Sequence, residues 1–118
     1  MKAAGKGSIV NISTSGALRP DPSFVPYAAA KAGLNNITES LAKAFGPEVR
    51  VNCISSGPFD TDVTKYWDPA MREPGGLPHF ALKRIGDPPE IVGAALYFAS
   101  DASSFTTGAL LRVDGGMP

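Results

Sequence analysis

Two side chains that could take part in proton transfer, a phenol and an ammonium, stand four residues apart in the segment Tyr27-Ala28-Ala29-Ala30-Lys31. The alanines between them favour a helix, on which residues i and i+4 share a face with Cβ atoms about 5–6 Å apart. A free phenol ionises at about pH 10, too high for a general acid or base at neutral pH. An ammonium about 4 Å away would stabilise the phenolate by roughly 4 kcal/mol at an effective dielectric of about 20. The spacing therefore indicates a proton-transfer pair; the alternative is an amphipathic pair that covers apolar surface.

The elements that must position this pair alternate between strand and helix patterns. Short, β-branched, apolar runs at 7–13, 49–54 and 109–113 predict three strands. A helix is expected from 23 or 26 to 45, and a second over about 87–100, where Asp-Pro-Pro-Glu supplies an N-cap, a first-turn proline and a capping-box glutamate. This order predicts an α/β fold, with a three-layer, Rossmann-like parallel sheet of about three strands and flanking helices.

The apolar patterns also predict which faces are buried. The first strand is apolar on both faces, as strands of a covered parallel sheet are. In the first helix, one apolar face is expected from Leu34, Ile37, Leu41, Ala44 and Phe45. In the second helix, the matching face comprises Ile91, Ala94, Ala95 and Phe98. No helix precedes the first strand, so its outer edge would be bare, and residues 1–118 are expected to form one partial domain.

A stretch without regular periodicity, residues 59–86, separates the second strand from the second helix. A loop this long inside a compact domain is usually functional, and we interpret it as a substrate lid. Its residues Tyr66, Trp67 and Met71 either line an apolar substrate pocket or only pack the lid. His79, a lone histidine in this loop, is expected either to face the solvent or to lie beside the substrate by accident.

Composition narrows the class of protein. Eleven basic and eleven acidic residues cancel, which argues against a nucleic-acid or anionic-membrane partner. The single Cys53 excludes an internal disulfide, fits a reducing cytoplasm and is expected in the core. No apolar run approaches the ~20 residues of a membrane helix. Asp60 and Asp62 are too few carboxylates for a metal site, so none is expected.

The ends of the predicted strands collect further candidates. Ligands of open parallel sheets bind outside the carboxyl ends of the strands. Thr14, Gly57 and Asp114 all fall at such ends, and the helix that carries Tyr27 and Lys31 begins on the same side. The sequence therefore places the proton-transfer pair at the edge of the sheet where a ligand would bind.

Several segments, in this order, resemble the short-chain dehydrogenase/reductase family. Residues 8–14 resemble the family's strand that ends in a catalytic hydroxyl, and 27–31 match its Tyr-x-x-x-Lys pair. Residues 50–61 resemble the segment ending in Pro-Gly-x-x-x-Thr, and 84–91 and 111–116 match the closing helix and strand. The resemblance covers essentially the whole chain, but only the second, catalytic half of a family member.

The resemblance implies a role for each matched residue in hydride transfer between NAD or NADP and a small-molecule alcohol or carbonyl compound. Tyr27 would be the general acid/base, Thr14 would position the reacting oxygen, and Lys31 would also hold the nicotinamide ribose. Tyr27 and Lys31 would thus contact the cofactor as well. The remaining cofactor-binding residues would be Gly57, Pro58, Phe59 and Thr61.

Three features depart from the family pattern. Thr14 takes the place of the usual serine, and a one-residue shift would hand the role to Ser13 or Ser15. Ser56 replaces the proline before Gly57, which would loosen the turn that faces the nicotinamide. The Gly-rich turn that seats the pyrophosphate and the family's catalytic asparagine have no counterpart.

Two functions follow. The first is an NAD(P)-dependent oxidoreductase of which this chain is the catalytic half. The alternative is a truncated, non-catalytic remnant or self-associating interaction module of the same fold. Under either reading, apolar strand edges lead us to expect a homo-oligomer, and the expected location is the cytoplasm. Binding of NADH or NADPH to the chain favours the first, and self-association alone favours the second.

Overall fold

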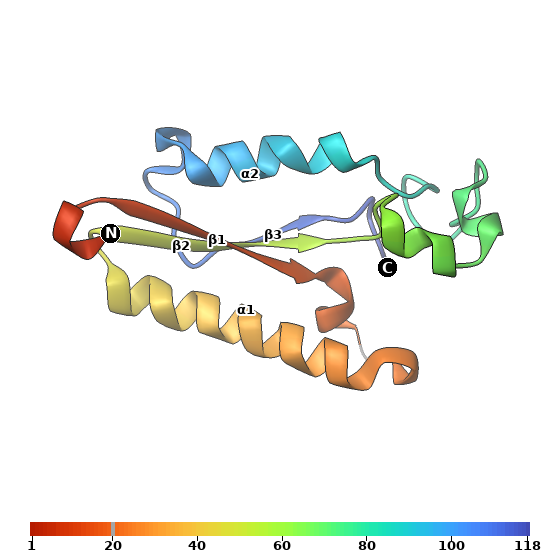
Figure 1. Ribbon diagram of the computed structural model, residues 1–118, viewed down its shortest axis with the longest axis horizontal. Helices are drawn as coiled ribbons and strands as arrows, with labels where there is room; N and C mark the ends of the chain where they lie inside the picture. Colours follow the sequence, from red (N-terminus) through yellow and green to blue (C-terminus); the bar gives the residue numbers. More distant parts are fainter. Residues whose placement is uncertain (20) are drawn as a thin grey trace.

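A parallel sheet carries the fold, and a helix covers each of its faces. The computed structural model describes residues 1–19 and 21–118. The strands β1 (Gly7–Thr14), β2 (Val49–Ser56) and β3 (Leu110–Val113) run parallel in the order β1-β2-β3. Helix α1 (Val25–Phe45) lies on one face and α2 (Val92–Ala99) on the other, as Figure 1 shows. The predicted three-layer α/β arrangement is confirmed.

The element boundaries differ from the prediction by only a few residues. β2 runs two residues further than expected, and α2 is preceded by a 3-10 turn, Pro88–Ile91, that begins with the predicted capping box. A similar 3-10 turn, Pro22–Phe24, leads into α1. Although α1 is 21 residues long, no helix in the described ranges combines the length and apolar character needed to span a membrane.

The central strand, and not the first, is the one buried on both faces. In β2, Val51, Cys53 and Ile54 have no exposed surface, which confirms Cys53 as a core residue. The prediction for β1 was wrong, because that strand is only half-buried and Ile12 is 49% exposed. Within the described residues, β1 pairs on one side only, and an apolar composition alone does not distinguish an outer strand from a central one.

The face of α1 that packs on the sheet is also displaced from the predicted one. The buried residues are Asn35, Thr38 and Ala42, whereas Ile37 is 50% exposed and Ala44 is exposed. Thr38 fits on this face because its hydroxyl donates to a carbonyl of its own helix and accepts from a sheet residue. Leu34, Leu41 and Phe45 flank this face half-buried, as predicted. In α2, Phe98 is buried and Ala94 and Ala95 are half-buried, as is Ile91 at the end of the preceding 3-10 turn, which confirms that face.

The irregular segment 59–86 is tied together at its base. The Gly86 amide donates to the Pro58 carbonyl, and the Asp60 amide donates to the Gly86 carbonyl, both at 2.9 Å. Two 3-10 turns, Asp62–Tyr66 and Pro69–Arg72, interrupt the loop. His79 is exposed, the first of its two expected placements, and Tyr66 is 87% exposed, so it does not pack the loop.

Candidate active site

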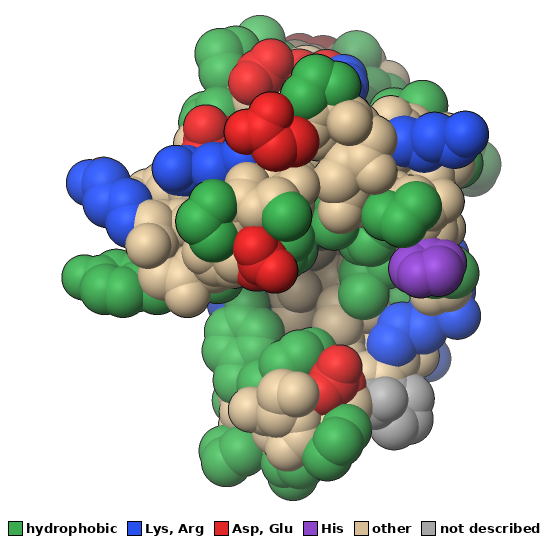
Figure 2. All heavy atoms as spheres, turned by 90° about the vertical axis from the view of Figure 1, so that its right-hand side faces the viewer, with side chains coloured by type: hydrophobic (Ala, Val, Ile, Leu, Met, Phe, Trp, Pro, Cys, Tyr) green, Lys and Arg blue, Asp and Glu red, His purple; other side chains and the backbone are tan. Residues whose placement is uncertain are grey.

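The candidate residues that follow the strands lie side by side. The parallel register pairs Thr14 with Ser56, and Ser56 with Val113. Thr14, Gly57 and Asp114 therefore sit at the same, carboxyl edge of the sheet, as the sequence predicts. Figure 2 looks onto this edge and shows the surface hollowed near its middle.

The pair Tyr27 and Lys31 is brought to this edge by the first two turns of α1. The Lys31 ammonium donates a hydrogen bond of 2.8 Å to the carbonyl of Ile12, near the end of β1. Its nitrogen lies 5.9 Å from the centre of the Tyr27 ring, within the range of cation–π attraction. The Tyr27 side chain is half exposed, and its hydroxyl makes no hydrogen bond among the described residues. The phenol is thus placed beside a fixed cation and remains accessible.

Three hydroxyl groups at the end of β1 differ in what already binds them. Ser13 is buried and donates to the Lys31 carbonyl at 3.2 Å. Ser15 is buried and donates to the Asp114 carboxylate at 2.6 Å. Thr14 is half-buried, and its oxygen accepts from the Gly16 amide at 3.2 Å. Because an accepting hydroxyl still has its own proton to give, Thr14 is the one of the three with a free donor.

Phe24 links the two parts of the site, and the sequence analysis missed it. Its ring packs edge-on against Tyr27, with centroids 6.2 Å apart and an interplanar angle of 79°. The same ring lies so close to Gly16 that a Cβ there would stand 3.1 Å from it. Phe24 thus fills the space between the phenol and the turn that follows Thr14. It lies where the start of the helix was left open, between 23 and 26, and no periodic pattern marks it as a contact residue.

The turn after β2 is fixed by backbone contacts. The Gly57 amide donates to the Val113 carbonyl at 2.9 Å, and a Cβ at Gly57 would stand 2.6 Å from the Cα of Asp114. The Ser56 hydroxyl donates to the Ser13 carbonyl at 3.1 Å. Ser56 therefore ties β2 to β1 where the family pattern has a proline.

The remaining candidates follow this turn outward. Pro58 and Phe59 are half-buried at the base of the 59–86 loop, where Phe59 pairs with Gly86. Thr61 is exposed, and its carbonyl accepts from the Thr64 amide at 3.0 Å. The structure thus leaves the Thr61 side chain at the surface, further along the loop than the other three.

Asp114 is the most connected group at this edge. Its carboxylate accepts from Ser15, from the Arg112 Nε at 2.8 Å and from the Gly116 amide at 3.1 Å, and it forms an ion pair with the Arg112 Nη2 at 2.7 Å. Burial acts to raise the pKa of Asp114, but these hydrogen bonds and the Arg112 charge outweigh it and hold the pKa below its ordinary value. The sequence placed Asp114 at a strand end without indicating these contacts.

The carboxylates of Asp60 and Asp62 each form an ion pair with a basic side chain. Asp60 pairs with Arg72 at 2.7 Å, and Asp62 with Lys65 at 2.5 Å. In the described part of the chain, no group of three His, Cys, Asp or Glu side chains lies close enough together to hold a metal ion.

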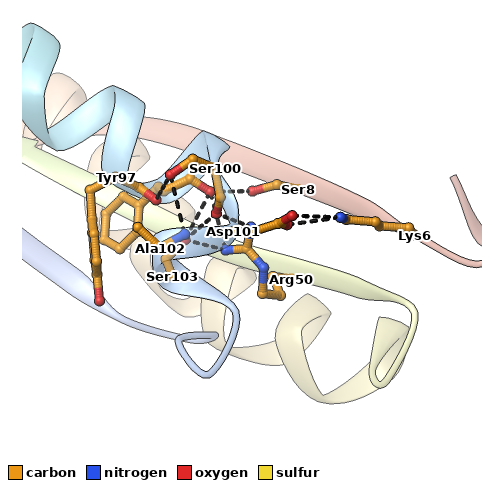
Figure 3. A network of polar contacts seen from close by, with 9 residues as sticks. Lys6, Ser8, Arg50, Tyr97, Ser100, Asp101, Ala102 and Ser103 are labelled. Carbon is orange, nitrogen blue, oxygen red and sulfur yellow. Dashed lines mark hydrogen bonds and ion pairs between the residues drawn. The ribbon is translucent and has the colours of Figure 1, made fainter.

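The opposite, amino edge of the sheet holds a different arrangement, which we call the Arg50 network. The Arg50 guanidinium donates to the Ser103 hydroxyl at 2.6 Å and to the carbonyls of Phe98 and Ser100 at 3.1 Å each. Ser8 donates to the Phe98 carbonyl at 2.7 Å. Figure 3 shows these side chains converging on the turn that ends α2. The network fastens α2 to the first residues of β1 and β2.

The fold and the carboxyl edge together define a class of protein: a Rossmann-like parallel sheet with a tyrosine and a lysine one helical turn apart beside a hydroxyl at a strand end. A sequence model described as enoyl-(acyl carrier protein) reductase matches residues 1–118. The chain belongs to the short-chain dehydrogenase/reductase family.

Individual relatives agree with this assignment. The chain is 46% identical over 120 residues to the 3-oxoacyl-(acyl-carrier-protein) reductase FabG of Chlamydia trachomatis, covering 99% of the chain and 47% of the relative. A gluconate 5-dehydrogenase from Burkholderia cenocepacia, solved with NADP and tartrate, is 30% identical with a TM-score of 0.89, over 98% of this chain and 46% of that one. A 7α-hydroxysteroid dehydrogenase solved with NADH and 7-oxo glycochenodeoxycholic acid is 32% identical with a TM-score of 0.91. This match covers 99% of this chain and 46% of that one. The chain thus spans about half the length of the relatives it matches.

Proposed function

We propose that this chain forms the catalytic part of an NAD(P)-dependent oxidoreductase that interconverts a small-molecule alcohol and its carbonyl compound. The observation that carries the proposal is the Lys31 ammonium, held by the Ile12 carbonyl and 5.9 Å from the ring of a half-exposed Tyr27. The chain's family supports the same chemistry.

Tyr27 is the proposed general acid/base. Its accessible hydroxyl gives a proton to the carbonyl oxygen in reduction and takes it back from the alcohol in oxidation. The Lys31 ammonium lies 5.9 Å from the centre of the ring that carries this hydroxyl. Because the Ile12 carbonyl binds one ammonium proton, Lys31 stays at this edge with two protons for other partners.

Thr14 is the proposed positioning hydroxyl. Its oxygen accepts from the Gly16 amide, which orients the hydroxyl and leaves its proton for the substrate oxygen. Ser13 and Ser15 already donate to protein oxygens, and this supports Thr14 over either neighbour. A donor held in place before substrate arrives stabilises developing negative charge without reorganisation.

The residues present fit a nicotinamide cofactor. Lys31 and Tyr27 together offer donors for ribose hydroxyls, and the Thr61 side chain is exposed for a carboxamide or a phosphate. The turn Gly57–Phe59 would supply backbone contacts beside it. When bound, the nicotinamide supplies or accepts the hydride. The relatives solved with NADP and with NADH support either cofactor.

The substrate is proposed by class only. The relatives' names span an acyl-carrier-protein ester, a sugar acid and a steroid, which share a ketone or secondary alcohol. The 59–86 loop, pinned at its base beside the site, is the proposed lid. The exposed Tyr66 and the half-buried Trp67 and Met71 supply its apolar surface. A cytoplasmic location is also part of the proposal, supported by the free, buried Cys53.

The proposal is tested with a chimera that joins residues 1–118 to the part of the chlamydial reductase outside the matched region. We expect the chimera to oxidise NADH or NADPH in the presence of a ketone substrate of that reductase, and cofactor to quench its Trp67 fluorescence. A folded chimera that binds cofactor without turning over would contradict the proposal.

Self-association is a second candidate, favoured by a specific surface. Among the described residues, β1 has an unpaired outer edge, and three apolar side chains on or just after α2 are exposed: Val92, Leu96 and Phe105. Edges and patches of this kind promote pairing with another copy. Light scattering of the chain should therefore report a homo-oligomer, and a clean monomer would exclude this candidate.

A further inference from the structure

Asp114 joins two segments, the end of β3 and the end of β1, at the carboxyl edge. Its side chain is 6% exposed and is fully engaged by Ser15, Arg112 and the Gly116 amide. A buried carboxylate is stable only when its charge is matched and its oxygens are bonded, and Arg112 supplies the charge and one hydrogen bond of 2.8 Å. The group is therefore held in one position.

Ser15 transmits that position to the end of β1. Its side chain is buried, its 2.6 Å bond to Asp114 is short, and its oxygen is also 3.4 Å from the Ser55 carbonyl. Hydrogen bonds to a charged acceptor are about twice as strong as neutral ones. Ser15 directly follows Thr14, and the Gly16 amide that orients Thr14 comes next. Holding Ser15 in place therefore also holds its two neighbours: Thr14 itself and the Gly16 amide that orients the Thr14 hydroxyl.

We propose that Asp114 is a positioning residue for the proton-transfer site, acting through Ser15 to hold the turn that presents the Thr14 hydroxyl. The inference rests on the proposed function for its catalytic consequence, but the positional claim stands on the contacts alone. It predicts that breaking the Ser15–Asp114 bond frees the turn at Thr14.

The positional claim is tested by amide hydrogen exchange in the 118-residue chain. Ser15→Ala and Asp114→Asn should each raise exchange at the Gly16 amide about tenfold relative to the core Val51 amide, because the turn opens locally. Ser103→Ala is the matched control, since Ser103 is equally buried and binds the Arg50 network at the far edge. Equal Gly16 exchange in the wild type and both test variants would overturn the inference.

The catalytic consequence is tested in the chimera by separating kcat from KM. Ser15→Ala and Asp114→Asn should lower kcat about tenfold or more, with the KM for cofactor within about twofold, because misplacing one group costs rate more than binding. The double variant should be no worse than the poorer single variant, since both act through one bond. Ser103→Ala should keep kcat. Loss of rate that is additive, or a loss seen equally in Ser103→Ala, would contradict a positioning role.

The two proposals fail in different ways. If Tyr27→Phe retains full turnover, the proposed function is wrong, while the exchange result at Gly16 still decides the positional claim. If Tyr27→Phe is inactive but Ser15→Ala and Asp114→Asn match the wild type in kcat and in Gly16 exchange, the proposed function stands and the role of Asp114 is wrong.

Discussion

The two edges of the sheet use polar groups in opposite ways. At the amino edge, the Arg50 guanidinium is bound by three protein oxygens, and Ser103 also donates to the Phe98 carbonyl. At the carboxyl edge, the phenol of Tyr27 and the proton of Thr14 have no protein acceptor among the described residues, although groups around them are fully bonded. A polar group whose hydrogen bonds are all made within the protein stabilises the fold. A polar group that is held in place but still has a free donor is available to bind a substrate.

The difference also appears in how each cation is anchored. Arg50 spreads its donors over one turn and so stabilises that turn. The Lys31 ammonium donates one hydrogen bond to the Ile12 carbonyl and lies over the ring of Tyr27, whose hydroxyl is accessible. The comparison predicts that substitutions at the carboxyl edge reduce rate without unfolding, and that those at the amino edge unfold without reducing rate.

The largest effect is expected from Tyr27→Phe in the chimera. Removing the proton donor should lower kcat about a thousandfold, within the range of general acid–base catalysis, while the Kd for cofactor stays within about threefold. Stopped-flow turnover and fluorescence titration measure the two. Tyr97→Phe is the control, because Tyr97 is 40% exposed and its hydroxyl binds Thr106 away from the site. Equal rates in both variants would contradict the claim that the carboxyl edge of the sheet carries the catalytic groups.

The next effect is expected on stability, from Arg50→Met. Three hydrogen bonds to a charged group disappear, and we expect the free energy of unfolding to fall by about 2–3 kcal/mol. Lys6→Met is the comparison, because the Lys6–Asp101 ion pair is about three-quarters exposed on both sides and such pairs contribute less than about 1 kcal/mol. Urea unfolding of the chimera measures both. A kcat that falls with Arg50→Met in the folded variant would show that the amino edge also serves catalysis.

The smallest effect concerns acid stability at the start of α2. Two hydrogen bonds from Arg84, and then the Asp87 amide, lower the pKa of Glu90 from 4.5 to about 2. A depressed carboxyl pKa stabilises the fold above the unfolded value, and this contribution is lost as pH falls from about 4.5 to about 2. Glu90→Gln should therefore be less stable than the wild type at neutral pH, with the difference vanishing across that window. Arg84→Gln should show the same trend in thermal melts from pH 7 to pH 2; a constant gap would contradict the linkage.

The fold could be predicted well from the sequence because hydrophobic periodicity and the capping and turn residues that end helices and strands are local signals. The alternation of strands and helices, the capping box at Asp87 and the shared edge of Thr14, Gly57 and Asp114 all follow from patterns within short windows. Burial was less predictable. Whether β1 is central or outer depends on its neighbours in the sheet, and the composition of β1 does not carry that information.

The candidate site divides in the same way. Tyr27 and Lys31 were placed by helical spacing, and the structure puts the Lys31 ammonium at the end of β1. The choice among three adjacent hydroxyls needed their hydrogen-bond partners, since a strand alternates faces and one residue decides which side a group points to. Phe24 and Asp114 act through contacts between distant segments, which no spacing in the sequence indicates.

The most direct test of the central claim is a crystal structure of the chimera with cofactor and a carbonyl ligand. The account predicts the ligand oxygen within hydrogen-bond reach, about 2.6–3.2 Å, of both the Tyr27 and the Thr14 hydroxyls, with Lys31 still bound to the Ile12 carbonyl. A ligand oxygen held instead by Ser13 or Ser15, or a Tyr27 ring turned away from it, would contradict the account.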